Sequence, residues 1–268
     1  MKIGFIGGGV MAEAIMKGIL DASLVNPENL LVSDLDSQRL GYLNKTLNVL
    51  GVESNLEVVN KSDIVILAIK PQNIKEVMVE LKGNSISGKS FLSIVAGVKT
   101  KMLQEGLGVD SIIRVMPNTP AQIKKGMTVW TSSKSVSPDI LSFSEKILSV
   151  LGEELYVDDE ALIDMSTALS GSGPAYMFLF MDALINAGIA IGMSKEMSVK
   201  LVRQTLLGSI ELAIGSEFEP TKLKEMVTSP GGTTEAALSK FEEGGFSDLV
   251  SEAVCAAFER AKFLGGKL

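Results

Sequence analysis

Short apolar runs alternate with amphipathic stretches through the first part of the chain. Helical periodicity fills the intervals between the runs, for instance at 11–22, 71–82 and 137–151. Strands that are apolar almost throughout are typical of a parallel sheet covered on both faces. The alternation therefore predicts a doubly wound α/β fold. The runs rich in β-branched residues are the predicted strands, at 2–7, 29–34, 63–69, 90–96, 111–116, 126–132 and 153–157.

Beyond about residue 160 the strand patterns stop and helical patterns take over. Ser194 and Ser247 are expected to be helix N-caps. The helices are apolar around their circumference, whereas a helical domain surrounded by water needs polar outer faces. We therefore expect an all-α domain that a second subunit covers in a helical dimer. Helices are expected at 161–192, with a break at the glycines of "SGSGP", and at 195–216, 221–227, 233–243 and 247–265.

The most apolar stretch, from Ala175 to Met193, is long enough to suggest a membrane span. Asp182 and Asn186 lie in its middle, and the sequence offers no second candidate span. A helix buried in a core or in a subunit interface is the better interpretation. The N-terminus leads directly into the first strand without a signal-peptide pattern, so we expect a cytoplasmic protein.

Composition narrows the chemistry. The 268 residues are 46% hydrophobic and carry a net charge of −7, which argues against nucleic acid or an anionic membrane as a partner. The chain has no histidine, so Ser-His-Asp, Cys-His and imidazole acid–base chemistry are excluded. The single cysteine, Cys255, excludes an internal disulfide and is expected to be a small core residue. No zinc or other metal site is expected.

A glycine turn follows the first strand and opens the first helix. In "KIGFIGGGVMAEAI" the spacing G-x-G-x-x-A uses Gly7, Gly9 and Ala12. The first glycine allows the tight turn, the second lets a pyrophosphate approach the backbone, and Ala12 allows close helix packing. At the first strand–helix junction of an α/β chain this pattern predicts a dinucleotide site.

The ends of the next strands carry candidate ligand contacts. Asp34 is placed to accept from a ribose 2′-hydroxyl and would favour NAD, while Ser33 and Arg39 favour NADP weakly. Asp34 as a simple strand-end turn former is the alternative. Lys70 is placed to orient cofactor or substrate, or else is a solvated lysine before a proline-started helix. Asn118 adds a neutral hydrogen-bonding group at the same rim.

The stretch "VTSPGGTT" (227–234) combines glycines and hydroxyls directly before a helix. Gly231 and Gly232 expose backbone N–H groups, and Thr234 has a hydroxyl to donate. The helix dipole favours negative charge at this end, so the stretch predicts an anion site. An ordinary capped loop is the alternative.

Three motifs, "MPNTPA" (116–121), "ALSGSGPAY" (168–176) and "VTSPGGTT", now stand beside a dinucleotide turn. Together they resemble pyrroline-5-carboxylate reductase, and the resemblance runs from Lys2 to about Lys262. It implies a Rossmann-type NAD(P)-binding domain at 1–158 and a helical substrate-binding and dimerisation domain at 159–268. It also implies an interlocked homodimer, with a pentamer of dimers (a decamer) as a further assembly. The implied reaction is NADPH- or NADH-dependent reduction of 1-pyrroline-5-carboxylate to L-proline.

Carried over by position, the resemblance also implies site residues, some of the substrate contacts coming from the partner subunit. Thr234 and Lys70 are the catalytic candidates, and Gly231 joins the substrate set through the anion-site argument. Asp34 departs from the family pattern, which often has a phosphate-binding hydroxyl there. The implied cofactor contacts are Ile6, Gly7, Gly8, Gly9, Val10, Met11, Asp34, Asn55, Ala68, Ile69, Lys70, Pro71 and Ala96. The implied substrate contacts are Glu160, Ser229, Gly232, Thr233 and Thr234.

The implied chemistry agrees with the composition. A cyclic imine carries its own proton part of the time, so the missing histidine is no obstacle and the enzyme must chiefly orient the imine carbon. The substrate carboxylate is then the expected anion on "SPGGTT". The alternatives are a β-hydroxyacid dehydrogenase, a ketol-acid reductoisomerase and a non-catalytic dinucleotide-binding regulator. The sequence lacks the catalytic lysine of a β-hydroxyacid dehydrogenase and the acidic cluster of a ketol-acid reductoisomerase. A non-catalytic regulator would not need "SPGGTT".

Overall fold

The computed structural model describes residues 1–86 and 88–267, which form two compact units. The sheet unit comprises residues 1–172 together with the end of the chain from Ala257, and the helical unit comprises Gly173–Ala256. This division by contacts falls inside the helical region of the sequence. It therefore differs from the functional division at residues 158 and 159, which stays a prediction.

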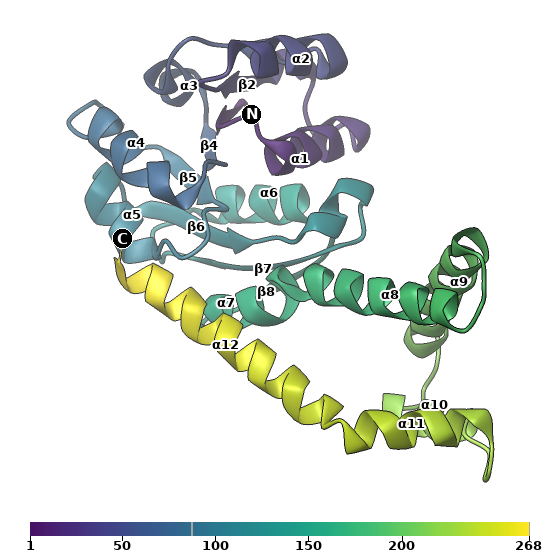
Figure 1. Ribbon diagram of the computed structural model, residues 1–268. Coiled ribbons are helices and arrows are strands. Elements are labelled where there is room, and N and C mark those ends of the chain that lie inside the picture. Colours follow the sequence, from purple (N-terminus) through teal and green to yellow (C-terminus); the bar gives the residue numbers. More distant parts are fainter. Residues whose placement is uncertain (87, 268) are drawn as a thin grey trace. The chain divides into compact units, whose positions relative to one another are not determined.

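The sheet unit contains one sheet in the order β3-β2-β1-β4-β5-β6-β7-β8 (Figure 1). All neighbouring strands are parallel except β6 and β7, which pair antiparallel. The expected α/β fold is confirmed, and among the strands of the described residues only the two-residue β3 was not predicted. The strands are β1 (Ile3–Ile6), β2 (Leu30–Ser33), β3 (Leu50–Gly51), β4 (Ile64–Leu67), β5 (Ser90–Ser93), β6 (Ser111–Met116), β7 (Gly126–Ser132) and β8 (Gly152–Tyr156).

Helices cover both faces of this sheet, and each face has its own buried cluster. Alternate residues of a strand point to opposite faces, so Ile3 and Phe5 join one cluster while Ile6 joins the other. Helices α1 and α6 pack on the first face and α3, α4 and α5 on the second. The helices of this unit are α1 (Val10–Asp21), α2 (Ser37–Leu47), α3 (Asn55–Lys61), α4 (Ile74–Leu81), α5 (Thr100–Leu107), α6 (Pro138–Ser149) and α7 (Ala161–Ser166), with short turns η1 (Pro27–Asn29), η2 (Pro71–Asn73), η3 (Thr119–Ile123) and the π-helical turn η4 (Thr167–Gly171).

The helical unit has little interior of its own. Among its residues only Ser198 is buried, and the rings of Phe180, Phe241 and Phe246 form a small aromatic cluster. The apolar helices predicted from the sequence are present, but their apolar side chains are exposed in the single chain. The helices are α8 (Gly173–Ala190), α9 (Lys195–Ile214), α10 (Pro220–Met226), α11 (Thr233–Glu243) and α12 (Phe246–Lys267), the last of which ends in the sheet unit.

Two local predictions in this unit turn out differently. Ser194 caps α9 as expected, its hydroxyl accepting from the N–H of Met197. Ser247 is not an N-cap, because Gly245 adopts a positive φ and α12 already begins at Phe246. Cys255 is exposed in the single chain instead of buried, because the helical unit encloses no core around it.

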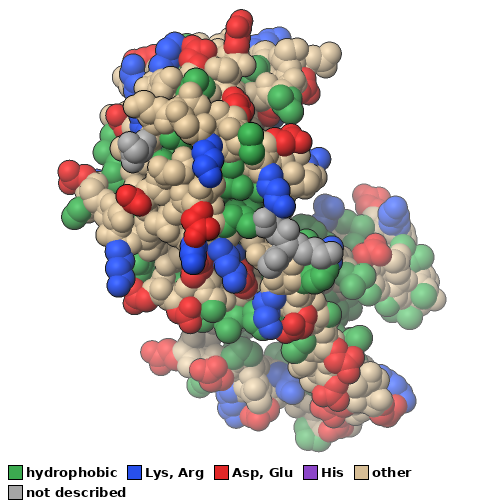
Figure 2. All heavy atoms as spheres, turned by 90° about the vertical axis from the view of Figure 1, so that its left-hand side faces the viewer, with side chains coloured by type: hydrophobic (Ala, Val, Ile, Leu, Met, Phe, Trp, Pro, Cys, Tyr) green, Lys and Arg blue, Asp and Glu red, His purple; other side chains and the backbone are tan. Residues whose placement is uncertain are grey.

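Acidic and basic side chains are interspersed over the face of the molecule drawn in Figure 2. Among the described residues one helical stretch, Ala161–Ala190, is long and apolar enough by composition to cross a membrane. None of its most apolar window is buried within the chain. Asn186 donates a hydrogen bond to Asp182 on the same helix at 3.0 Å, so these two polar side chains of α8 pair with each other.

Candidate active site

The turn between β1 and α1 has the geometry that a dinucleotide needs. Gly7 adopts a φ of +94°, and a Cβ there would lie 2.6 Å from the carbonyl oxygen of Ala68, so only glycine fits. Gly9 faces open space, because a Cβ built on it meets nothing within 4 Å. A pyrophosphate can therefore approach the backbone closely at Gly9, which is the fit that a dinucleotide requires.

Helix α1 begins directly after this turn and presents its first N–H groups to an anion. Its N-cap is Gly9, which has no side chain to satisfy them, and Val10 is 61% exposed. The positive end of the helix dipole favours negative charge at this point. Val10 and Met11 would therefore contribute backbone N–H groups to an anion bound at this turn.

A cavity of about 460 Å³ opens beside this turn, at the carboxyl ends of β1, β2 and β4. Ligands of doubly wound sheets bind at this edge. The cavity brings together most of the residues predicted to bind the cofactor, although they come from distant parts of the sequence. These are Ile6, Gly7, Gly9, Asp34, Asn55, Ala68, Ile69 and Lys70.

The other predicted cofactor residues lie outside the lining of this cavity. Gly8 is turned toward the interior, where a Cβ would lie 2.8 Å from Leu43. Ala96 is half-buried after β5. The set outside the lining is Gly8, Val10, Met11, Pro71 and Ala96.

Several residues that line the cavity were not predicted. Four of them share one face of a helix and the turn before it, because Asn73, Glu76, Val77 and Glu80 recur at helical spacing. The helix pattern at 71–82 contained this information, but nothing in the sequence indicated which face meets the ligand. The unpredicted lining residues are Leu35, Glu53, Ser54, Asn73, Glu76, Val77 and Glu80, and Ser33, which the sequence suggested as a weak contact for NADP, lines the cavity as well.

Asp34 is tied to the glycine turn. Its Oδ2 accepts from the N–H of Gly8 at 2.7 Å, and its Oδ1 accepts from the N–H of Asp36 at 2.9 Å. The carboxylate thus acts as a turn former and also lines the cavity. The position of Asp34 is therefore compatible with both alternatives from the sequence, a contact to the ribose 2′-hydroxyl and a strand-end turn former.

Arg39 is also held by this turn. Its Nε donates to the carbonyl oxygen of Gly8, and its Nη2 pairs with Glu13 at 2.5 Å and donates to Gly9 at 3.3 Å. The guanidinium carbon lies 5.0 Å from the ring centroid of Tyr42. Arg39 therefore braces the turn from outside the cavity.

The loop "SPGGTT" lies between α10 and α11 in the helical unit and already holds a carboxylate. Gly231 adopts a φ of +70° and its N–H donates to Oε2 of Glu235 at 2.7 Å. Gly232 is the N-cap of α11, and a Cβ there would lie 2.4 Å from Oγ of Ser229. Thr233 and Thr234 form the first turn of the helix. The loop therefore brings these predicted residues together at a helix N-terminus.

Glu160, predicted to contact substrate, belongs to a polar network of the sheet unit. Its Oε1 accepts from the N–H and Oγ1 of Thr100 at 2.7 and 2.9 Å and from Nη1 of Arg114 at 2.9 Å. The other arm of the buried Arg114 pairs with Asp164 at 2.6 Å. Glu160 thus caps α5 and joins α7 to the sheet, and its contact with substrate stays a prediction.

Two of the quoted motifs meet inside the sheet unit. Asn118 of "MPNTPA" donates to the carbonyl oxygen of Ser170 at 3.0 Å, and its Oδ1 accepts from the N–H of Met127. Ser170 belongs to the π-helical turn η4, which precedes α8 where the sequence predicts a break. The side chain of Asn118 therefore links the "SGSGP" segment to β7.

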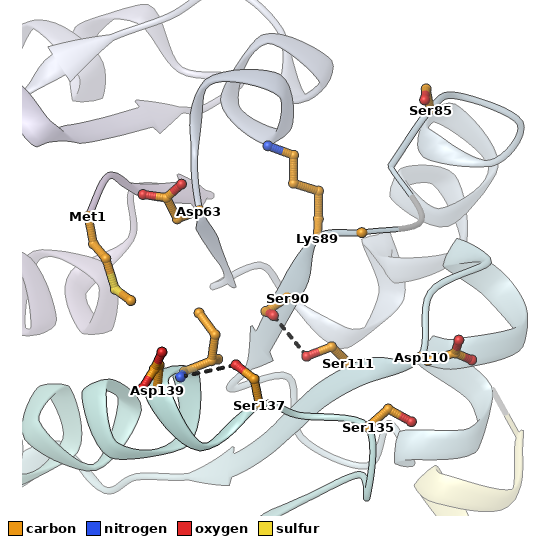
Figure 3. Close-up of a pocket in the computed structure, with 12 residues that line it drawn as sticks. Met1, Asp63, Ser85, Lys89, Ser90, Asp110, Ser111, Ser135, Ser137 and Asp139 are labelled. Carbon is orange, nitrogen blue, oxygen red and sulfur yellow. Dashed lines mark hydrogen bonds between the residues drawn. The ribbon is translucent and has the colours of Figure 1, made fainter.

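A larger cavity of about 910 Å³ lies at the opposite, amino edge of the same sheet (Figure 3). Met1, Asp63, Ser90 and Ser111 of its lining precede or begin strands, and the hydroxyls of Ser90 and Ser111 form a hydrogen bond of 2.8 Å. Lys89 points away toward carbonyl oxygens at the end of α3. Doubly wound sheets do not bind cofactors at this edge, so the larger volume of this cavity does not make it the cofactor site.

The carboxyl-edge cavity, the open glycine turn and the uncapped start of α1 indicate a Rossmann-type dinucleotide-binding protein. Two family models match the chain: NADP oxidoreductase coenzyme F420-dependent over residues 2–97, and pyrroline-5-carboxylate reductase dimerisation over residues 160–264. The pyrroline-5-carboxylate reductase of Synechocystis is 40% identical, covering 100% of this chain and 99% of the relative. That of Pseudomonas aeruginosa is 39% identical, covering 100% and 98%.

A solved structure gives the same result. Pyrroline carboxylate reductase of Plasmodium falciparum, with NADP bound, is 34% identical with a TM-score of 0.90, covering 99% of this chain and 98% of that one. The chain belongs to the pyrroline-5-carboxylate reductase family. The resemblance stated from the motifs, the fold class, the enzyme class and the use of NAD(P)H are confirmed.

Proposed function

We propose that this chain reduces 1-pyrroline-5-carboxylate to L-proline, the last step of proline biosynthesis, and that its site residues act as follows. The reaction and the NAD(P)H dependence follow from membership of the family. When bound, NAD(P)H supplies the hydride that reduces the C=N bond. Gly7 and Gly9 admit the pyrophosphate, the first N–H groups of α1 bind it, and Lys70 orients the bound molecules at the end of β4.

The substrate carboxylate is proposed to bind the "SPGGTT" loop. The observation that carries this is the carboxylate of Glu235, which accepts from the N–H of Gly231 at 2.7 Å. A substrate carboxylate would replace it there, with Thr234 donating its hydroxyl and the dipole of α11 adding to the attraction. Holding the carboxylate fixes the imine carbon, which is the orientation that the reaction needs.

The roles proposed for the two domains are those that the sequence predicts. Residues 1–158 would bind the cofactor and residues 159–268 the substrate, with Ser229, Gly231, Gly232, Thr233 and Thr234 as contacts. We propose an interlocked homodimer, supported by the dimerisation family match and by the exposed apolar helices, with a pentamer of dimers as its further assembly. Cytoplasmic location, with no membrane or nucleic-acid partner, completes the proposal.

The direct test is oxidation of NADH and, separately, NADPH in the presence of racemic 1-pyrroline-5-carboxylate. The expected result is oxidation that depends on the imino acid, with L-proline formed in equal amount. Folded protein that oxidises neither cofactor would contradict the proposal and would favour the non-catalytic regulator.

A further inference from the structure

The cofactor cavity of the sheet unit is acidic, although it has to take an anionic dinucleotide. Asp34, Glu53, Glu76 and Glu80 all line it. Among the described residues of this lining, Lys70 is the one cation. This balance bears on which of the two nicotinamide dinucleotides the cavity accepts.

The carboxylates gather around the end of β2. Ser33, the last residue of β2, donates from its hydroxyl to Oδ1 of Asn55 at 2.7 Å. Asn55 in turn donates from Nδ2 to Oε2 of Glu80 at 2.6 Å. Asp34 follows Ser33 directly, so Asp34 and Glu80 flank this hydrogen-bonded pair. The adenosine ribose of a dinucleotide lies at the end of the second strand in this fold, whereas Lys70 comes from the end of β4.

Arg39 and Ser33, the two residues that the sequence suggested for NADP, are already occupied by other partners. Arg39 pairs with Glu13 and donates to the carbonyl oxygens of Gly8 and Gly9, and it does not line the cavity. Ser33 is 4% exposed, and its hydroxyl donates a hydrogen bond to Asn55.

The position after Asp34 does not supply a cation either. Leu35 is 97% exposed and lines the cavity. It offers an apolar surface to a base and nothing to a phosphate.

We infer that the adenosine end of this cavity selects the dinucleotide without a 2′-phosphate, so that NADH is the preferred cofactor, with Glu53 and Glu80 acting beside Asp34 as specificity-determining residues. A phosphate monoester carries about −1.5 to −2 charges at neutral pH, and like charges in one cavity repel. Asp34 accepts from a ribose 2′-hydroxyl but repels a phosphate in its place. The inference rests on the proposed reductase function.

The first test is equilibrium binding to the intact protein, followed by the fluorescence of NADH and NADPH at low and at high salt. The Kd for NADPH is expected to exceed that for NADH about tenfold or more at low salt, because three carboxylates each contribute a few-fold. The ratio should fall as salt is raised, because screening weakens the repulsion. A ratio of one or less at low salt, or a ratio that rises with salt, would overturn the inference.

The second test is substitution. Glu53→Gln and Glu80→Gln should each lower the ratio of Kd values about threefold to tenfold, through tighter NADPH binding with NADH little changed. Glu80→Gln retains an oxygen that accepts from Asn55. The matched control is Glu153→Gln on β8, which removes the same charge six strands away from β2 in the sheet and should leave the ratio unchanged. Equal ratios in all three variants would overturn the role of the two glutamates.

Arg39→Met distinguishes the remaining alternative. If Arg39 only braces the turn, both Kd values rise together. If it held a 2′-phosphate, the Kd for NADPH alone would rise, and the inference would be wrong. The proposed function fails separately: protein that binds NADH but shows no oxidation dependent on the imino acid contradicts the reductase and leaves the selectivity intact.

Discussion

The two units of this chain bury their apolar side chains to very different extents. In the sheet unit, strand residues such as Ile3, Phe5 and Ile66 are 0% exposed, and two clusters fill the space between sheet and helices. In the helical unit only Ser198 is buried, while Leu179 is 73% exposed and Ile214 is 80% exposed. Both units have apolar sequences, but only the sheet unit contains the complementary surfaces within one chain.

The difference teaches where each part obtains its stability. A helix that is apolar on several faces must bury them against something, and monomeric proteins rarely expose large apolar patches. The family match to a dimerisation region covers residues 160–264, which includes the whole helical unit. We therefore expect the sheet unit to fold within one chain and the helical unit to be completed by a second copy.

The largest expected effect comes from a charge placed on the helical unit. Leu179→Glu on α8 should dissociate the assembly and abolish activity, because a buried, unpaired carboxylate is costly. Val79→Glu on α4 is the matched control, since Val79 is 76% exposed in the single chain and belongs to the sheet unit. Sedimentation of both variants is the measurement. Unchanged mass for Leu179→Glu would contradict the comparison.

The next effect concerns ion pairs in the two units. Arg114→Ala leaves the nearly buried Asp164 without its partner, so the free energy of unfolding should fall by about 3–5 kcal/mol. Lys240→Ala breaks the exposed pair with Glu243 in the helical unit and should cost about 0–1 kcal/mol. Denaturant unfolding of the intact protein measures both. Equal costs would show that burial of Arg114 is not what stabilises the sheet unit.

Alanine substitutions at two glycines of the same turn should affect different properties, stability at one position and cofactor binding at the other. Gly7→Ala forces a Cβ against the carbonyl oxygen of Ala68 at positive φ and should destabilise the fold by about 1–3 kcal/mol. Gly9→Ala adds a Cβ to open space, so stability should hold while the Kd for NADH and NADPH rises roughly tenfold. Thermal unfolding and binding, measured on both, separate the two. Unchanged binding by Gly9→Ala would remove Gly9 from the pyrophosphate site.

The smallest effects distinguish neighbours on the "SPGGTT" loop. Thr234→Ala should raise the KM for the imino acid by about tenfold, the loss of roughly 1–3 kcal/mol for a hydrogen bond to a charged group. Glu235→Ala frees the N–H of Gly231 and should lower that KM a few-fold, since an internal competitor is removed. Initial rates at varied imino acid give both values. A KM that rises in both variants would assign Glu235 to substrate binding instead of competition.

Local patterns predicted the elements of the fold well. The strand positions followed from β-branched runs, and the glycine turn and the "SPGGTT" helix start followed from short motifs. Strand β3 was missed because a two-residue strand, Leu50–Gly51, has no period to detect. Serine favours N-cap positions, which predicts a cap at Ser247, but α12 begins at Phe246, directly after Gly245 with its positive φ.

The cofactor cavity was predicted only in part, for a physical reason. Gly7, Gly9 and Lys70 lie at strand ends, where the fold itself places ligands. Glu80 lines the cavity because it lies on the face of α4 that meets it. Arg39 does not line the cavity, because it pairs with Glu13, twenty-six positions earlier in the sequence. Such contacts depend on how elements pack, and no spacing in one sequence indicates them. The acidic character of the cavity is therefore visible only in the folded chain.

The most direct measurement for this account is amide hydrogen exchange of the wild type and of Leu179→Glu, compared under the same conditions. The account predicts that protection in the sheet unit is the same in both, because its core lies within one chain. It predicts that protection in α8, α9 and α11 is high in the wild type and lost in the variant. Strong protection of these helices in a monomeric Leu179→Glu protein would contradict it.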